Sequence, residues 1–243
     1  MNRGGSDRDG APRIERTIRR VDAPDIPEEV MASELDKDAR GRLRTLSKDN
    51  ADDVARHLVM AGRLLDDDPE LAYKHAQVAL ARGGRVDIVR EAAAVTAYAT
   101  GRYAEALREF RTVVRLNGTT EHLPLMADCE RGLGRPARVL ELAASPEAAS
   151  LIGDPKIEMQ IVVAGARADM GEFDAALHAL DSIVAEGSET VSRVAEARSS
   201  IIAMMTPASQ ASESPDNVES SVEQDDDFDD EVIVYDLEED IDD

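Results

Sequence analysis

The sequence contains no tryptophan, three phenylalanines, four tyrosines and one cysteine among its 243 residues. A single cysteine excludes an intramolecular disulfide and suits a reducing compartment. With so few aromatic side chains, the core must be built from Ala, Leu, Val, Ile and Met, which favour helices and close packing between them. This composition predicts a helical protein whose helices lie near one another.

Long apolar runs are also absent. No uncharged stretch approaches the roughly 20 residues that a membrane-spanning helix needs. Residues 1–20 are basic, but they lack the apolar segment of a secretory signal. We therefore expect a soluble cytoplasmic protein that has no membrane partner.

The C-terminal part has no basic residues. Residues 207–243 hold 16 of the 51 Asp and Glu residues and no Lys or Arg, which leaves 35 acids against 28 bases, or −7, in residues 1–206. Residues 1–26 are polar and rich in Gly and Pro, with four arginines between positions 13 and 20. We predict a disordered Arg-containing segment at 1–26, a helical repeat domain at 27–206 and a disordered acidic tail at 207–243.

Motifs for chemistry are missing as well. There is no phosphate-binding glycine loop, and the four histidines never fall three or four residues apart, so they and one cysteine supply no zinc ligand set. Cys129 is predicted to be a buried, inert thiol. The run "DDDP" at 66–69 lacks the spacing of a calcium loop, and Asp68 before Pro69 instead predicts a helix N-cap. We expect no enzyme activity, no catalytic residue, no cofactor and no metal.

The middle of the chain reads as helix after helix, separated by short breaks that contain Gly or Pro. No segment shows the alternation of apolar and polar residues that is typical of strands. Pro27 with two following acids predicts the start of an N-terminal helix, and a final helix is expected near 188–205. The fold class predicted from this pattern is all-α.

Three of the breaks introduce similar stretches, "GRYAEALREF" at 101, "GRPARVLELA" at 134 and "GEFDAALHAL" at 171. Gly101 is expected to end a helix in the left-handed conformation. Pro146 should shorten the second helix of the third repeat. The residues that follow each turn at the same offset are spaced 34, 33 and 37 apart: Ala72, Ala106, Val139 and Ala176. Repeats of this length predict helical hairpins that bury their apolar faces against one another.

At these residues the chain resembles the tetratricopeptide repeat (TPR) family, and as a whole it is similar to uncharacterised TPR-containing proteins of actinobacteria. The turn pattern G-x-Y/F-x-x-A-L matches at 101–107 and 171–177 and partly at 134–140, whereas the first repeat lacks the glycine and the aromatic residue. The resemblance covers residues 53–186. It implies an α-solenoid of about four TPR-like hairpins with flanking capping helices.

The resemblance also implies a partner-binding groove lined by the first helix of each hairpin. The Lys and Asn clamp with which some TPR domains hold a terminal carboxylate is not reproduced, so a receptor for such tails is disfavoured. The groove positions that we predict are His57, Leu64, Glu91, Tyr98, Asp128 and Arg131.

These observations favour a non-enzymatic scaffold or adaptor that binds another protein or peptide. The alternative is a nucleic-acid- or ribosome-associated factor that uses the arginines at 13–20 and the ten arginines between residues 80 and 140, with the acidic tail as regulator. Aromatic residues for base stacking are not interleaved with these arginines, and the net charge opposes nucleic-acid binding. We therefore expect no nucleic-acid partner.

The tail carries a second candidate site. In "DDDFDDEVIVYDLEEDIDD", residues 225–243, apolar side chains stand among carboxylates. Such a segment can bind in a groove or add to a sheet, either on the arginine-bearing repeats of the same molecule or on a separate partner, or it can remain solvated. The predicted interaction element consists of Phe228, Val232, Ile233, Val234, Tyr235 and Leu237.

Overall fold

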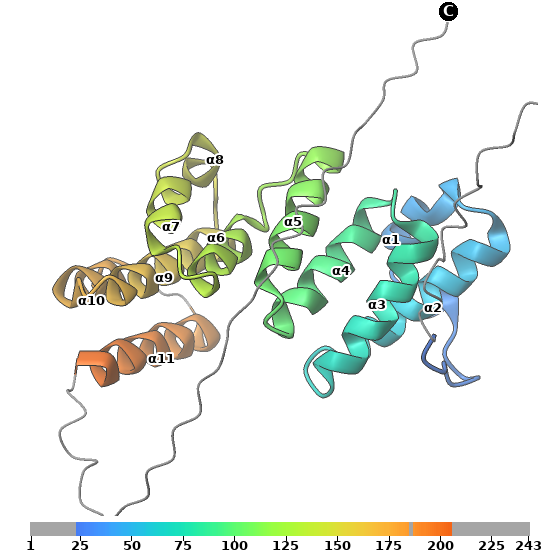
Figure 1. Ribbon diagram of the computed structural model, residues 1–243, viewed down its shortest axis with the longest axis horizontal. Coiled ribbons are helices and arrows are strands. Elements are labelled where there is room, and N and C mark those ends of the chain that lie inside the picture. Colours follow the sequence, from blue (N-terminus) through green and yellow to red (C-terminus); the bar gives the residue numbers. More distant parts are fainter. Residues whose placement is uncertain (1–22, 185–186, 206–243) are drawn as a thin grey trace, which may run out of the picture. The chain divides into compact units, whose positions relative to one another are not determined.

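The structure is a computed structural model that describes residues 23–184 and 187–205. These residues belong to the first of two units of the chain, Met1–Thr206, whereas the second unit, Pro207–Asp243, lies outside the described residues. All regular elements within the described ranges are helices, and no strand occurs there (Figure 1). The prediction of an all-α fold is confirmed.

Two short 3-10 helices, η1 (Ala32–Glu34) and η2 (Leu43–Thr45), flank the first α-helix. The α-helices follow in this order: α1 Lys37–Arg42, α2 Lys48–Leu64, α3 Pro69–Gly83, α4 Asp87–Ala99, α5 Tyr103–Asn117, α6 Leu123–Gly132, α7 Pro136–Ala143, α8 Pro146–Ala149, α9 Asp154–Asp169, α10 Phe173–Asp181 and α11 Ser188–Met205.

The helices pack in pairs that are consecutive along the chain. The four pairs, each joined by a short turn, are α2–α3, α4–α5, α6–α7 and α9–α10. Contacts between pairs come mainly from α3 against α4, α5 against α6, and α6 and α7 against α9, with a smaller contact of α2 against α4. The expected final helix is confirmed as α11, which packs on α9 and α10.

Three of the four pairs are joined by the same turn. Its glycine is left-handed, with φ of 73°, 71° and 79° at Gly101, Gly134 and Gly171. In each turn the next residue donates its backbone N–H to the carbonyl five residues earlier at 2.8–2.9 Å, as Arg102 does to Ala97. This is the Schellman arrangement, in which the glycine satisfies the last carbonyls of the first helix. The predicted left-handed conformation of Gly101 is confirmed, and Gly134 and Gly171 share it.

The turn of the first pair is built differently, as its sequence predicted. The Asp68 side chain accepts a hydrogen bond from the backbone N–H of Leu71 at 3.0 Å, and Pro69 is the first residue of α3. A carboxylate at the N-cap satisfies a donor that the helix leaves free, and proline has no N–H to lose there.

The repeat alignment marks residues that are buried in the structure. Phe110 and Leu180, four residues after the aligned positions of their repeats, are also buried, and the Phe110 ring lies 5.3 Å from that of His122. The aligned positions themselves are all 0% exposed: Ala72, Ala106, Val139 and Ala176. The spacing seen in the sequence therefore marks the contact between the two helices of each pair.

The second helix of the third pair is shortened, as was predicted from the position of Pro146. Helix α7 ends at Ala143, and Pro146 opens the separate helix α8. The Ser145 hydroxyl caps α8 by accepting the N–H of Ala148 at 3.1 Å. Proline at the first position of a helix removes a donor that has no partner there, so the break costs little.

The prediction of a helix starting at Pro27 is wrong. Residues 28–29 form a turn, and the chain reaches α1 only after the isolated helix η1. The Arg56 side chain of α2 donates to the carbonyls of Val30 and Pro27, at 2.8 and 3.2 Å. These two hydrogen bonds satisfy carbonyl groups that would otherwise accept hydrogen bonds within a helix. A contact with a distant residue therefore outweighs the local preference for a helix at Pro27.

The buried position of Ala106 generates a stability prediction. Ala106→Leu should lower the free energy of unfolding by about 1–3 kcal/mol, because the larger side chain overpacks the contact between α4 and α5. The matched control Ala104→Leu lies two residues away at an exposed position and should change stability by less than about 0.5 kcal/mol. Urea unfolding followed by circular dichroism measures both, and equal midpoints would contradict this assignment.

Candidate functional site

The six predicted groove residues do not share one environment. Leu64, Tyr98 and Arg131 stand at equivalent positions of successive repeats, on or at the ends of α2, α4 and α6, and all are half-buried. His57 is 2% exposed and lies in the interior, so it does not line an open surface. Glu91 is half-buried, with a carboxylate oxygen 3.3 Å from the His122 Nε2 atom.

The structure brings Tyr98, Asp128 and Arg131 together with a fourth residue, Asp169. The Tyr98 hydroxyl donates to Asp128 Oδ2 at 2.6 Å, and Arg131 Nη1 donates to Asp128 Oδ1 at 2.9 Å. Arg131 Nε donates to Asp169 Oδ2 at 2.7 Å. We call these four residues the tyrosine–arginine cluster. It joins the first helices of three consecutive pairs, α4, α6 and α9.

The electrostatic environment of the tyrosine–arginine cluster keeps Tyr98 and Arg131 protonated. Burial, together with the Asp128 carboxylate, raises the pKa of Tyr98 well above its ordinary value, so the hydroxyl remains a donor. Burial tends to lower the pKa of Arg131, but Asp128 and Asp169 outweigh it and the pKa is raised. The formal charges of two aspartates and one arginine give the cluster a net charge of −1.

A cleft of about 420 Å³ opens beside the tyrosine–arginine cluster. Helical glycines make room for its walls: a Cβ on Gly132 would meet the Tyr103 ring at 2.5 Å, and one on Gly165 would meet Arg131 Nη1 at 2.9 Å. The Tyr103 ring also packs edge-on against Tyr98, with centroids 6.0 Å apart. The cleft is lined by Tyr103, Asp128, Arg131, Gly132, Gly134, Pro136 and Asp169.

A second recess, which we call the apolar groove, lies where α1, α2 and α4 meet. Its volume is about 290 Å³, and Glu91 is the one charged residue among those that line it. It combines residues of the N-terminal segment with the first helices of two pairs. The lining consists of Leu35, Ala39, Leu58, Ala61, Gly62, Leu65, Ile88, Glu91, Ala92, Val95 and Thr96.

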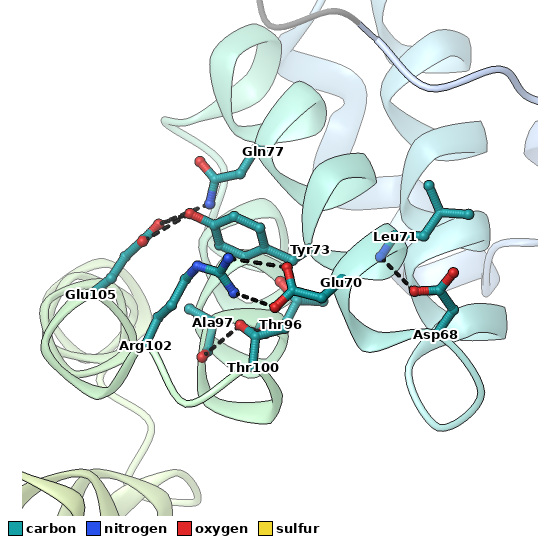
Figure 2. Close-up of polar contacts among 10 residues, drawn as sticks. All are labelled: Asp68, Glu70, Leu71, Tyr73, Gln77, Thr96, Ala97, Thr100, Arg102 and Glu105. Carbon is teal, nitrogen blue, oxygen red and sulfur yellow. Dashed lines mark hydrogen bonds and ion pairs between the residues drawn. The ribbon is translucent and has the colours of Figure 1, made fainter. Parts of the chain in front are cut away.

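Polar side chains also connect the first two pairs, as Figure 2 shows. Arg102 donates to both carboxylate oxygens of Glu70 at 3.0 Å, and its guanidinium carbon lies 4.2 Å from the centre of the Tyr73 ring. The Tyr73 hydroxyl and the Gln77 amide donate to Glu105 at 2.9–3.0 Å. Burial, and to a lesser extent the neighbouring Glu105 carboxylate, raises the pKa of Tyr73 to about 12. These contacts fix α3 against the start of α5.

A buried histidine pair was not foreseen from the sequence. The Nδ1 atoms of His57 in α2 and His75 in α3 are 2.9 Å apart, so one ring donates and the other accepts. Burial lowers the pKa of both rings, that of His75 to about 4, because a charged imidazole would lose its hydration there. The two residues are 18 apart in sequence, and only the pairing of α2 with α3 brings them together.

Other groups offer little reactive chemistry. Cys129 is buried, as predicted, and burial raises the pKa of its thiol to about 12, which suppresses the nucleophilic thiolate. Across the described ranges, no three His, Cys, Asp or Glu side chains gather in a way that could hold a metal ion. In the same ranges no helix combines the length and apolar character that crossing a bilayer requires. The tail element, Phe228 to Leu237, lies outside the described residues.

No protein-family model, curated protein or solved structure matches the chain. The resemblance to TPR proteins therefore stays an interpretation of the sequence. What the structure contributes is the repeated turn and the aligned buried positions.

Gly132 allows a test of how the cleft wall is built, with Gly62 of α2 as the control. Gly132→Ala should destabilise the fold by about 1–3 kcal/mol, because the new methyl group overlaps the Tyr103 ring. Gly62→Ala, in α2, has open space around the new methyl group and should stabilise by about 0.5–1 kcal/mol through helix propensity. Chemical denaturation measures the change in the free energy of unfolding for each variant. If both substitutions stabilise the fold, Tyr103 can move to make room at Gly132 and the prediction is wrong.

The histidine pair predicts loss of stability in acid. The pKa of His75 is about 4 in the folded state and about 6.5 when unfolded, so the unfolded chain binds more protons between these values. The stability that comes from keeping His75 neutral should be fully present above about pH 6.5. It should decrease as the pH falls towards 4. Replacing both His57 and His75 with Gln should flatten this part of the profile. His178→Gln, at an exposed position, should not; a profile insensitive to the double change would refute the assignment.

Proposed function

We propose that the chain is a non-enzymatic scaffold or adaptor for protein–protein interaction, acting in the cytoplasm. In this proposal the four helix pairs stack as a TPR-like α-solenoid, with the N-terminal segment and α11 as caps. The recurring Schellman turn and the aligned buried residues support it, because repeated helix pairs bury their apolar faces only against neighbours. Another protein or a peptide is the proposed partner.

The observation that carries the proposal is the location of the two recesses. The apolar groove is lined mainly by α2 and α4, and the cleft beside the tyrosine–arginine cluster by α6 and the end of α9, together with Tyr103 and Pro136 at the starts of α5 and α7. Helices α2, α4, α6 and α9 are the first helices of their pairs. An apolar recess gives affinity to an inserted side chain, while fixed polar groups nearby orient the peptide.

The state of the polar groups favours binding over catalysis. The hydroxyl of Tyr98 is held as a donor by Asp128, and Arg131 is shared by two carboxylates. General acid–base catalysis needs a group with a pKa near the working pH. The pKa shifts in this cluster move Tyr98 and Arg131 away from that range.

A peptide selection tests the proposal. Peptides enriched from a random displayed library on the full chain should bind in the apolar groove, and Gly62→Glu should weaken them about tenfold or more by placing a charge at the groove. Gly62 has open space around its Cβ position, so the fold should tolerate the change. The matched control is Gly41→Glu, which also has open space and does not line the groove. Affinities are measured by fluorescence anisotropy.

Two results would refute this proposal. One is a library from which no peptide is enriched. The other is a set of peptides whose affinities are unchanged by Gly62→Glu, or lowered equally by Gly41→Glu, since binding would then not depend on the groove.

A further inference from the structure

Exposed arginines gather on the helices α5 to α7. Arg108, Arg111 and Arg115 follow one another on α5 at three- and four-residue spacing, so they share one face of that helix. Arg135 and Arg138 stand at the start of α7. All five are exposed, in a chain whose formal charge is −23. A local excess of positive charge in an acidic protein requires an explanation.

Several of these arginines are held by two buried carboxylates. Glu109 and Glu130 are 2% and 5% exposed and are the two buried acidic residues among those that the structure describes. Each of them contacts two arginines. Glu109 accepts from Arg90 at 2.6 Å and from Arg108 at 3.3 Å. One buried negative charge therefore serves two guanidinium groups, which leaves a net charge of +1 in each set.

Glu130 orients two arginines from different elements. Its Oε1 accepts from Arg111 of α5 at 3.0 Å, and its Oε2 lies 3.5 Å from Nη1 of Arg135, the residue that precedes α7. The side chains of these arginines remain 61% and 59% exposed, so their outer N–H groups face solvent. An arginine fixed in this way loses less conformational entropy when it binds a second anion.

These residues surround a cleft of about 370 Å³, which we call the arginine cleft. It shares no lining residue with the apolar groove or with the cleft beside the tyrosine–arginine cluster. Among its residues, three arginines outweigh two glutamates. The arginine cleft is lined by Arg111, Glu130, Arg135, Arg138, Glu141, Leu142 and Ser145.

We propose that the arginine cleft is a second binding surface, which takes a carboxylate-rich peptide segment of a partner protein. The guanidinium groups of Arg111, Arg135 and Arg138 present paired N–H donors to carboxylates, a geometry that supports bidentate hydrogen bonds. Leu142 offers an apolar contact within the same cleft. The matching segment therefore has acidic residues around an apolar one.

A peptide fits the arginine cleft better than a nucleic acid does. Glu141 is 62% exposed inside the lining, where it forms an ion pair with Arg138 at 2.5 Å, and it would repel a backbone that carries a phosphate at every nucleotide. A peptide can place a neutral or apolar residue opposite Glu141 and Leu142 and its carboxylates opposite the arginines. The arginine cleft also contains no aromatic side chain on which a base could stack.

The test uses the full chain and a short fluorescein-labelled peptide in which glutamates flank a leucine. We expect saturable binding that weakens as salt is added. Arg111→Gln with Arg138→Gln should weaken it about tenfold, since two charge-assisted contacts are lost. Arg138→Gln alone leaves both contacts of Glu130 intact and should weaken binding severalfold. Melting temperatures verify that the variants are folded.

The matched control is Arg40→Gln with Arg85→Gln, which removes the same charge from exposed positions outside the arginine cleft. An equal loss in this control would overturn the proposal, because binding would then follow net charge alone. Equal or tighter binding of a single-stranded oligonucleotide that depends on Arg111 and Arg138 would overturn it in favour of nucleic acid.

A form of the full chain in which the acidic residues of 225–231 are replaced by Asn and Gln distinguishes the source of the segment. Unchanged affinity for the labelled peptide supports a separate partner. Tighter binding by this form would show that the chain's own acidic segment competes for the arginine cleft, and it would overturn the assignment to a partner protein.

Discussion

The close approach of two helices at a small residue is the constraint on which the rest of the structure depends. Ala72, Ala106 and Ala176 occupy that contact in three pairs, and Val139, the largest of the four, occupies it in the shortest pair. With no Trp and few Phe or Tyr residues, the chain cannot fill wide spaces between helices. Close packing of small side chains is therefore how it gains dispersion contacts and excludes water.

The same shortage of large apolar residues explains why polar groups enter the interior. His75 and Glu109 stand 34 residues apart at equivalent positions of the first two pairs, and both are buried. Each finds its partner on the preceding helix, His57 for His75 and Arg90 for Glu109. A buried polar group is tolerated when it is hydrogen-bonded, and losing one partner leaves the other costly to keep. The paired residues therefore fix which helix faces which.

The sequence was sufficient to predict the features that depend on local chemistry. The left-handed conformation of Gly101, the Asp68 cap and the break at Pro146 all follow from backbone preferences of single residues. The helix expected at Pro27 failed because Arg56, far along the chain, binds the carbonyls of that segment. The histidine pair was missed for the same reason, since its geometry depends on how α2 and α3 pack.

The candidate site was predicted in part for a related physical reason. The resemblance to TPR proteins implied that Tyr98, Asp128 and Arg131 lie on the first helices of their pairs. It does not give the offset between α4, α6 and α9, and that offset decides that these three residues meet one another and Asp169. The glycines that make the contacts possible, Gly132 and Gly165, carry no signal of their own in a helix. Their role can be recognised only once the side chain that packs against each of them is known.

One repeat position differs in chemical character from pair to pair. The position occupied by Leu64 in the first pair holds Tyr98 in the second and Arg131 in the third. Of these three residues only Arg131 lines a recess, the polar cleft, whereas other residues of α2 and α4 line the apolar groove. A repeat keeps its buried positions small because they hold the helices together, whereas its outer positions are free to diverge. A partner that contacts both recesses would have to present apolar groups to the groove and polar groups to the cleft. This requirement would select both the sequence of the partner and the orientation in which it binds.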